Sequence, residues 1–214
     1  LISHGHSPLF ALPVSFLAGA VAGTMTGFIH TKLKVNALLA GILVMTALYS
    51  INLAVMGRSN IPLINTPTLF HLIQISGSEI QQQFFILTIL TAIVFVKILW
   101  LLKTDFGLAM RATGNNEKMI RALGVNTDAM KIFGIALANG LTAVSGYLIT
   151  QIQGYADINM GIGIVIIGLG SVMIGQILFS GKAKEKLFTN LLGVIIGSIV
   201  FRLILAFALS IGID

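Results

Sequence analysis

Six long apolar runs constrain the fold of this chain more than any other feature of its sequence. Each run is roughly 18 residues or longer and holds at most one charged side chain, and a helix needs about 20 apolar residues to cross a bilayer. The runs cover residues 9–29, 35–56, 84–102, 132–152, 160–179 and 187–209. We therefore predict about six membrane spans.

The composition argues against a soluble protein. Only 9% of the 214 residues are charged and 56% are hydrophobic, whereas soluble domains carry roughly 25% charged residues. Lipid cannot satisfy backbone polar groups, and the runs lack the alternation of barrel strands, so the spans should be helices. We predict an all-α polytopic membrane helix bundle that forms one transmembrane domain over residues 1–214. Because the sequence starts at Leu1 and ends at Asp214 directly after an apolar run, we expect it to be part of a longer chain.

Basic residues alternate between the connections that join the runs. Three connections hold ten of the 13 Lys and Arg residues: Lys32 and Lys34; Lys103, Arg111, Lys118, Arg121 and Lys131; and Lys182, Lys184 and Lys186. The two connections between them hold only Arg58. Under the positive-inside rule the three basic connections face the cytoplasm and the N-terminus faces outside. The net charge of +6 therefore reports membrane topology rather than nucleic-acid binding.

Small residues recur every fourth position in several runs. The sets are Ser15, Gly19, Gly23 and Gly27; Ala138, Thr142 and Gly146; and Gly193 and Gly197. Such faces allow membrane helices to approach closely, so we expect tight helix contacts there. The glycine-rich run 160–179 leaves open whether that helix is continuous or interrupted.

Few polar side chains lie within the runs, and they are the candidates for a solute pathway. They include Tyr49, Asn52, Asn139, Gln151 and Arg202. The uncharged ones could instead bond neighbouring helices. Arg202 should face protein or water, because exposing it to lipid costs a few kcal/mol or more. It is either a pathway residue or a structural anchor paired with carbonyl groups.

The sequence contains no recognisable motif of catalytic or metal-binding residues. All seven carboxylates lie outside the apolar runs, the four histidines are scattered, and cysteine is absent. Thiol chemistry is excluded, and we predict no catalytic residue, metal site or cofactor.

The connection between the third and fourth runs has the signals of ordered structure. Asp105 is placed to cap a short helix that runs to about Ala112 and is broken by Gly114. Asn126 or Thr127 is placed to cap the span that follows. Two short capped helices with no core of their own need something to dock against.

The second of these helices is predicted over residues 117–123. Asn115 or Asn116 is placed to cap it, and Gly124 ends it. Its side chains mix apolar and basic groups: Met119, Ile120 and Leu123 with Lys118 and Arg121. An amphipathic cytoplasmic helix of this kind lies on lipid headgroups or inserts into a groove of a partner protein, and the residues alone leave both open.

Residues 106–148, FGLAMRATGNNEKMIRALGVNTDAMKIFGIALANGLTAVSGYL, resemble a known family. They are similar to the permease subunits of ATP-binding-cassette importers in the branched-chain amino acid and ribose permease group. The matching positions are Phe106, Gly107, Arg111, Ala112, Gly114, Asn116, Ala122, Gly124 and Val125, then Gly140, Ser145 and Gly146 in the following span. The stretches 38–63 and 154–175 are most similar to the branch of tryptophan- and tyrosine-type transport permeases.

The resemblance implies a permease rather than an enzyme, located in the bacterial plasma membrane and moving a small solute such as an amino acid. It implies three protein partners: a cytoplasmic ATPase, an extracytoplasmic solute-binding protein, and a second permease subunit in a homodimer. Residues 103–131 would form the segment that couples the spans to the ATPase. The coupling residues implied are Arg111, Gly114, Asn115, Asn116, Glu117, Lys118, Met119, Ile120, Arg121, Leu123 and Gly124.

Two other classes of transport protein remain as alternatives. A channel or facilitator would explain the glycines and Arg202 but not the capped connection. A secondary transporter would need an ionisable coupling group within a span, and no carboxylate lies there. The nearest approach to a phosphate-binding loop, residues 175–183, has one residue too many between its glycines and Ala183 where Ser or Thr is required. We therefore expect ATP hydrolysis in a partner.

Overall fold

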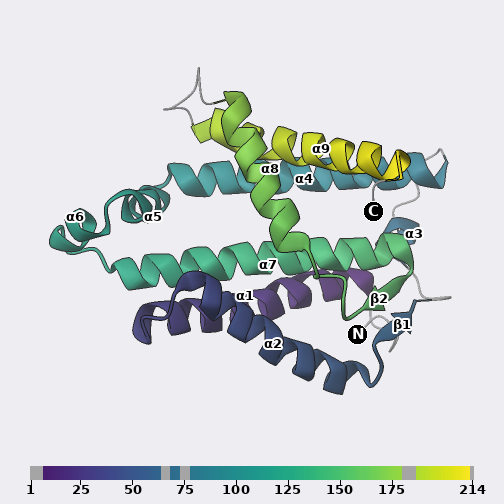
Figure 1. Cartoon of the computed structure of the whole chain (residues 1–214), viewed down its shortest axis with the longest axis horizontal. Coiled ribbons are helices and arrows are strands. Elements are labelled where there is room, and N and C mark those ends of the chain that lie inside the picture. The colour runs from purple at the N-terminus through teal and green to yellow at the C-terminus, as the bar shows by residue number, and fades with distance from the viewer. Residues whose placement is uncertain (1–6, 64–67, 73–77, 180–186, 213–214) are drawn as a thin grey trace. The chain divides into compact units, whose positions relative to one another are not determined.

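The computed structural model describes residues 7–63, 68–72, 78–179 and 187–212. These residues form helices joined by short connections, with one small sheet (Figure 1). The elements are α1 (Pro8–Lys32), α2 (Ala37–Met56), β1 (Asn60–Pro62), α3 (Leu69–Leu72), α4 (Glu79–Lys103), α5 (Asp105–Asn115), α6 (Glu117–Ala122), α7 (Thr127–Gln153), β2 (Tyr155–Asp157), α8 (Ile164–Phe179) and α9 (Leu187–Ser210). The prediction of an all-α polytopic bundle is confirmed.

Five of the described helices are long and apolar enough to cross a membrane, namely α1, α2, α4, α7 and α9. The sixth predicted span corresponds to α8, which has 16 residues and so a length of about 24 Å. It starts at Ile164 rather than at residue 160, because Gly163 has a left-handed φ of 82° that ends the preceding turn. From Ile164 to Phe179 the helix is uninterrupted.

The chain divides into two compact units, each considered by itself. The first contains α1, α2, the sheet, α3, α5, α6, α7 and both ends of α4. The second contains the segment Ile93–Trp100 of α4 together with α8 and α9.

In the first unit, α1 packs along α7 (Figure 1). The glycines of α1 face the backbone of α7, as the spacing of small residues predicts. A β-carbon at Gly23 would lie 2.6 Å from the carbonyl oxygen of Ile135 and 2.7 Å from Cα of Ala136. At Gly27 it would lie 2.9 Å from Cα of Ile132. Only glycine allows the two helices to approach this closely.

In the second unit, α8 packs against α9 in a similar way. A β-carbon at Gly197 would lie 2.6 Å from the backbone nitrogen of Gly175. Gly193 is also buried against α8, and the ring of Phe201 lies over Gly170. The predicted contact through Gly193 and Gly197 is therefore present. Gly146 of α7, by contrast, has open space where a side chain would be.

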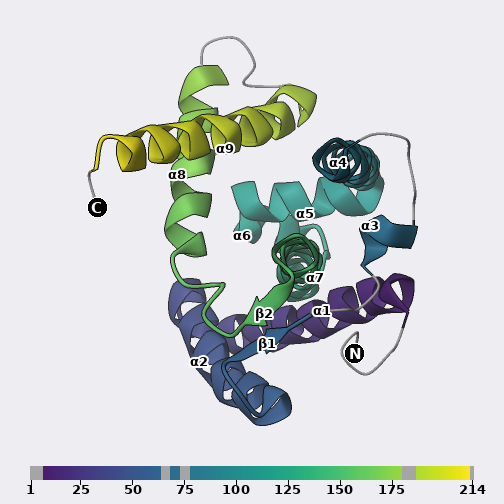
Figure 2. The ribbon, with the colours of Figure 1, turned by 90° about the vertical axis from the view of Figure 1, so that its right-hand side faces the viewer.

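The two strands pair connections that lie 90 residues and more apart in the chain. β1 and β2 are antiparallel, with Asn60 opposite Asp157 and Pro62 opposite Tyr155, and Figure 2 shows them side by side. Both connections were predicted to face outside. They lie at one end of α7, and α5 and α6 lie at the other end (Figure 1), which agrees with the alternation of charge along the chain. The sequence analysis did not predict the sheet.

Candidate functional site

The long connection between α4 and α7, which was predicted to be cytoplasmic, starts with a sharp turn between α4 and α5. Thr104 caps α5, since its Oγ1 accepts a hydrogen bond from the backbone N–H of Gly107 at 3.2 Å. Gly107 is buried, and a β-carbon there would lie 2.5 Å from Cα of Leu102. A glycine at this position is what lets the chain fold back on the last turn of α4.

The first short helix differs from its prediction at both ends. Thr104, rather than Asp105, is the cap, and Asp105 occupies the first turn. The helix also continues past Ala112 and through Gly114 to Asn115. A helix can include a glycine at a cost of about 1 kcal/mol. Here Gly114 is exposed and close to the end of the helix, where no packing depends on it.

α5 is fixed to α7 by aromatic packing. The rings of Phe106 and Phe133 meet edge to face, with their centroids 4.8 Å apart. Met110 of α5 also lies beside Gly134 of α7. Edge-to-face contacts of this kind are favourable because the positive edge of one ring faces the negative face of the other. The short helix is thereby oriented by α7.

α6 is capped as predicted. Oδ1 of Asn116 accepts a hydrogen bond from the backbone N–H of Met119 at 3.1 Å, which selects Asn116 over Asn115 as the cap. Gly124 follows the helix with a left-handed φ of 84°. At the start of α7, Oδ1 of Asn126 accepts a hydrogen bond from the N–H of Ala129 in the same manner. Asn116 and Gly124 thus mark the start and the end of α6, and Asn126 marks the start of α7.

The three apolar side chains of α6 have different surroundings. Ile120 is 9% exposed, whereas Met119 is 58% and Leu123 is 68% exposed. Ile120 thus anchors α6 within this chain and is not available to another protein. Met119 and Leu123 form an apolar pair that the described part of the chain leaves uncovered. Lys118 is also exposed.

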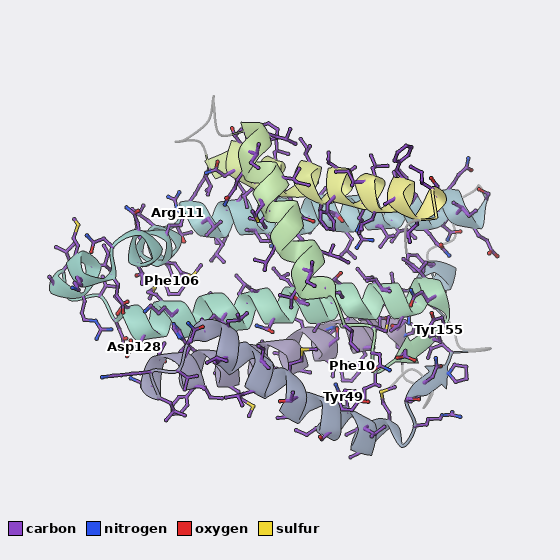
Figure 3. The ribbon with its side chains drawn as sticks, in the orientation of Figure 1. Phe10, Tyr49, Phe106, Arg111, Asp128 and Tyr155 are labelled. Atoms are coloured by element: carbon purple, nitrogen blue, oxygen red, sulfur yellow. The ribbon has the colours of Figure 1, made fainter. Side chains whose placement is uncertain are left out.

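A network of charged side chains ties α6 to the neighbouring helices. Glu117 accepts hydrogen bonds from Lys131 Nζ at 2.6 Å and from Arg121 Nη2 at 3.1 Å. Arg121 Nη2 also lies 2.9 Å from Asp128 Oδ1. Lys32, at the end of α1, completes the network with a distance of 3.3 Å from its Nζ to Asp128 Oδ2. Figure 3 marks Asp128 at the end of α7 that lies next to α6.

The network joins α6 and α7, which follow each other in the sequence, to the distant α1. Thr127 lies at its centre, buried, with its Oγ1 donating to Glu117 and accepting from Arg121. Arg121, which was expected to face a partner, is engaged by groups of its own chain. Of the basic residues of α5 and α6, Arg111 and Lys118 are exposed and outside the network.

The network also alters the acidity of Glu117. The hydrogen bond from Lys131, together with the positive charge of Lys131 and bonds from Thr127 and Arg121, lowers the pKa of Glu117 below its ordinary value of 4.5. Desolvation acts in the opposite direction and is outweighed. Glu117 is therefore ionised at neutral pH.

The candidate pathway residues have different surroundings within their own units. Tyr49 and Asn52 are exposed on α2, and Arg202 is exposed on α9 in the second unit. Asn139 is half-buried and donates to the carbonyl of Ile135 in its own helix at 2.9 Å. These placements leave the pathway roles of the four residues as predictions.

Gln151 has a definite structural contact. Its side chain is 4% exposed, and its Oε1 accepts a hydrogen bond from the N–H of Leu69 in α3 at 2.9 Å. Gln82 of α4 donates to the carbonyl of Phe70 at 2.7 Å, so two amides from two helices hold α3. Nε2 of Gln151 is buried and finds no hydrogen-bond partner in the described structure. The sequence analysis did not anticipate this anchoring of α3, because no local pattern indicates it.

No group of three or more His, Cys, Asp or Glu residues that could hold a metal ion is found among the described residues. The charged network contains two carboxylates and three cations, and each of the five groups is directly paired with a group of opposite charge. Its geometry serves to fix α6 in place rather than to carry out chemistry.

Comparison with known proteins identifies the class to which this arrangement belongs. A helical membrane bundle with a structured cytoplasmic connection is typical of transport permeases, and the family described as "Branched-chain amino acid transport system / permease component" matches residues 1–212. The chain belongs to this family of importer permease subunits, which function with ATP-binding-cassette partners. It is a multi-pass protein of the bacterial plasma membrane.

Individual relatives agree with this assignment. The chain is 40% identical over 214 residues to the tyrosine transport system permease protein of Clostridioides difficile, covering 99% of this chain and 68% of that protein. It is 28% identical over 202 residues to the autoinducer 2 import system permease protein LsrC of Yersinia pestis, covering 91% of this chain and 50% of that protein. No solved structure matches.

Proposed function

We propose that this chain forms a single permease domain over residues 1–214 and that residues 103–131 are its coupling segment. The solute is an amino acid or a related compound, and the energy comes from ATP hydrolysed by a separate cytoplasmic subunit. One observation carries the proposal: α6 is anchored from within by Ile120 and by ion pairs, yet it leaves Met119 and Leu123 exposed on the cytoplasmic side.

The exposed side chains define what the partner must offer. Met119 and Leu123 are apolar and more than half exposed, and such side chains dock into apolar grooves. Lys118, next to Met119 in the sequence, and Arg111 of α5 are exposed, and both favour acidic groups or backbone carbonyls at the rim of the groove. A groove of this chemistry on the ATPase would grip α6. Closure of the ATPase pair would then rock the spans between outward-facing and inward-facing arrangements.

The remaining partners follow from the same proposal. A second permease subunit, as a homodimer, would supply the other half of the pathway, and an extracytoplasmic binding protein would deliver the solute to the outer face. The named relative that transports tyrosine supports an amino acid as the solute. Tyr49, Asn52, Asn139, Gln151 and Arg202 are the candidates for lining the pathway.

The docking of α6 is testable by chemical labelling, because the chain contains no cysteine. We expect a cysteine at Leu123 to react with a maleimide in the permease alone and to be protected when the ATPase is bound. The control is Tyr155→Cys, since Tyr155 is exposed at the opposite end of α7. Its reactivity should not change. Equal labelling of Leu123→Cys with and without the ATPase would contradict the docking site.

A functional test uses the same side chain. Leu123→Asp places a charge in the apolar contact, so it should abolish the rise in ATPase activity that loaded binding protein causes, while the permease still inserts into the membrane. Ile120→Asp is not an equivalent test, because Ile120 is buried and the charge would disrupt the attachment of α6 itself. Transport that persists in Leu123→Asp, or that follows an ion gradient without ATP, would overturn the proposal in favour of a channel or a secondary transporter.

A further inference from the structure

We infer that Glu117 and Asp128 are positioning residues that pass movement of α6 to both α7 and α1. This inference rests on the proposed function, since it assumes that a partner moves α6. It concerns the charged side chains that pair with one another between the helices, whereas the docking proposal concerns the exposed pair Met119 and Leu123.

Glu117 connects α6 to α7 directly. Its two carboxylate oxygens are divided between helices: Oε2 accepts from Lys131 of α7 at 2.6 Å, and Oε1 accepts from Arg121 of α6 and Thr127 of α7. A displacement of the first turn of α6 therefore pulls on two side chains of α7. These side-chain contacts act in addition to the backbone link between the helices, which runs through Gly124.

Asp128 extends the connection to α1. Its Oδ1 lies 2.9 Å from Arg121 of α6, and its Oδ2 lies 3.3 Å from Lys32 at the end of α1. One carboxylate thus holds cations from two helices whose sequences are 89 residues apart at these positions. Lys32 is close to no other described carboxylate that would replace Asp128.

The helices that receive the movement form a stiff pair. Gly23 and Gly27 of α1 lie directly against the backbone of α7, and Phe16 covers Gly140. Backbones in such close contact cannot slide past each other without clashes. A pull on Lys32 and Lys131 at one end therefore displaces the pair as a unit.

The network is poorly suited to a purely stabilising role. Two of its three cations are largely exposed, with 59% of the Arg121 side chain and 52% of the Lys32 side chain accessible, whereas Lys131 is 30% exposed. Exposed ion pairs contribute little to folding stability, because water and salt screen them. Their geometry still restricts orientation, which is the property needed to transmit a movement.

Asp105 provides a matched control within the same connection. It lies in the first turn of α5, as Glu117 lies in the first turn of α6, and both are carboxylates near a helix N-terminus. Asp105 is exposed and forms no ion pair with another described residue. Replacing either carboxylate by its amide removes one negative charge from a helix start, but only Glu117→Gln breaks the network.

The functional experiment measures solute moved per ATP hydrolysed in vesicles that hold the permease with its ATPase. We expect this ratio to fall in Glu117→Gln and in Lys131→Glu and to stay at the wild-type value in Asp105→Asn. The double variant Glu117→Lys, Lys131→Glu should recover part of the loss relative to either charge reversal alone, because the pair is restored with exchanged signs. An unchanged ratio in Glu117→Gln, or a double variant worse than both singles, would overturn the inference.

A second measurement needs no partner and separates this inference from the proposed function. In the isolated permease, Glu117→Gln should speed hydrogen exchange at the backbone amides of α6 and leave the middle of α1 and α7 protected. Unchanged exchange in α6 would disprove the positioning role even if ATP-driven transport is established. If wild-type vesicles show no ATP-driven transport while α6 exchange responds to Glu117→Gln, the proposed function fails and the structural connection stands.

Discussion

The two close helix pairs of this protein, α1 with α7 and α8 with α9, use the same contact but differ in what surrounds it. In both pairs glycines place one backbone directly against another. The first pair has polar contacts at both ends as well: Lys32 with Asp128 at one end, and the hydroxyl of Tyr147 with the carbonyl of Pro8, at 2.7 Å, at the other. In α8 and α9 the observed side-chain hydrogen bonds of Ser171 and Ser198 stay within their own helices.

This difference has a physical consequence in a membrane. Lipid is as apolar as a leucine side chain, so the hydrophobic effect does not drive helices together, and close packing must do so. Polar contacts at the ends add orientation to the packing of α1 on α7. Among the described residues, the close contacts of α8 with α9 lie at the glycine face, so that pair should be the more sensitive to a change at the face.

The largest effect is expected when the glycine face of α8 and α9 is filled. In Gly197→Ala the new methyl group would lie 2.6 Å from the backbone nitrogen of Gly175 and 2.8 Å from its Cα, so the helices must separate. We expect a loss of about 3 kcal/mol in the free energy of unfolding, at the upper end for overpacking. SDS-induced unfolding in mixed micelles, followed by circular dichroism, measures it. The control is Gly168→Ala, where the side chain enters open space; equal losses in both variants would show that the face does not hold the pair together.

The same substitution in the other pair should cost less. Gly23→Ala brings a methyl group to 2.6 Å from the carbonyl oxygen of Ile135, but the contacts at the two ends limit how far α1 can move. We expect about 2 kcal/mol by the same unfolding measurement. Gly146→Ala on α7 meets no atom and should be close to neutral. A loss in Gly23→Ala larger than that in Gly197→Ala would mean that the packing of α1 on α7 is the more sensitive of the two pairs to a change at its glycine face.

The sequence predicted those structural features that are determined by residues close to one another along the chain. The apolar runs located the long helices to within a few residues. The caps were narrowed to Asn115 or Asn116 and to Asn126 or Thr127, and the structure selects Asn116 and Asn126, whose side chains bond backbone groups three residues ahead. The spacing of Gly19, Gly23 and Gly27 predicted a close contact, although not that its partner would be α7.

Contacts between distant parts of the chain could not be predicted in this way. Lys32 and Asp128 meet only because α1 packs on α7, and β1 pairs with β2 only because α2 and α7 end near each other. The periodicity of a six-residue helix is too short to show that Ile120 faces inward and Leu123 outward. For the same reason the sequence did not show that Arg121, although exposed, bonds three groups of its own chain.

A smaller effect is expected from the polar contact at the far end of α1. Tyr147→Phe removes the hydroxyl that donates to the carbonyl of Pro8 and keeps the ring in place. We expect a loss of about 1 kcal/mol in the free energy of unfolding, typical of one hydrogen bond. Tyr49→Phe is the control, because Tyr49 is 46% exposed and no side-chain hydrogen bond is found for it among the described residues. Equal values for the two variants would mean that this end of the pair is not fixed by the hydroxyl.

The smallest effect concerns pH at the other end. The pKa of Glu117 is lowered below 4.5, chiefly by Lys131, so its contribution is present above the unfolded-state pKa and is lost as the pH falls through the folded-state pKa. We therefore expect the hydrogen-exchange protection of α6 to be constant between about pH 5.5 and 7.5 and to decline only below 4.5.

The pH response of Glu117 can be separated experimentally from that of the rest of the network. Asp128 is the one other carboxylate of the network, and its pKa is also lowered, chiefly by the hydrogen bond from Lys32. Glu117→Gln removes the titrating group while Asp128 stays, so it should lower protection at neutral pH and diminish the acid-induced decline. If the hydrogen-exchange protection of α6 declines equally in the wild-type protein and in Glu117→Gln, the pH response belongs to Asp128 instead. The main attachment of α6 would then be its contact with Asp128, the carboxylate that also reaches α1.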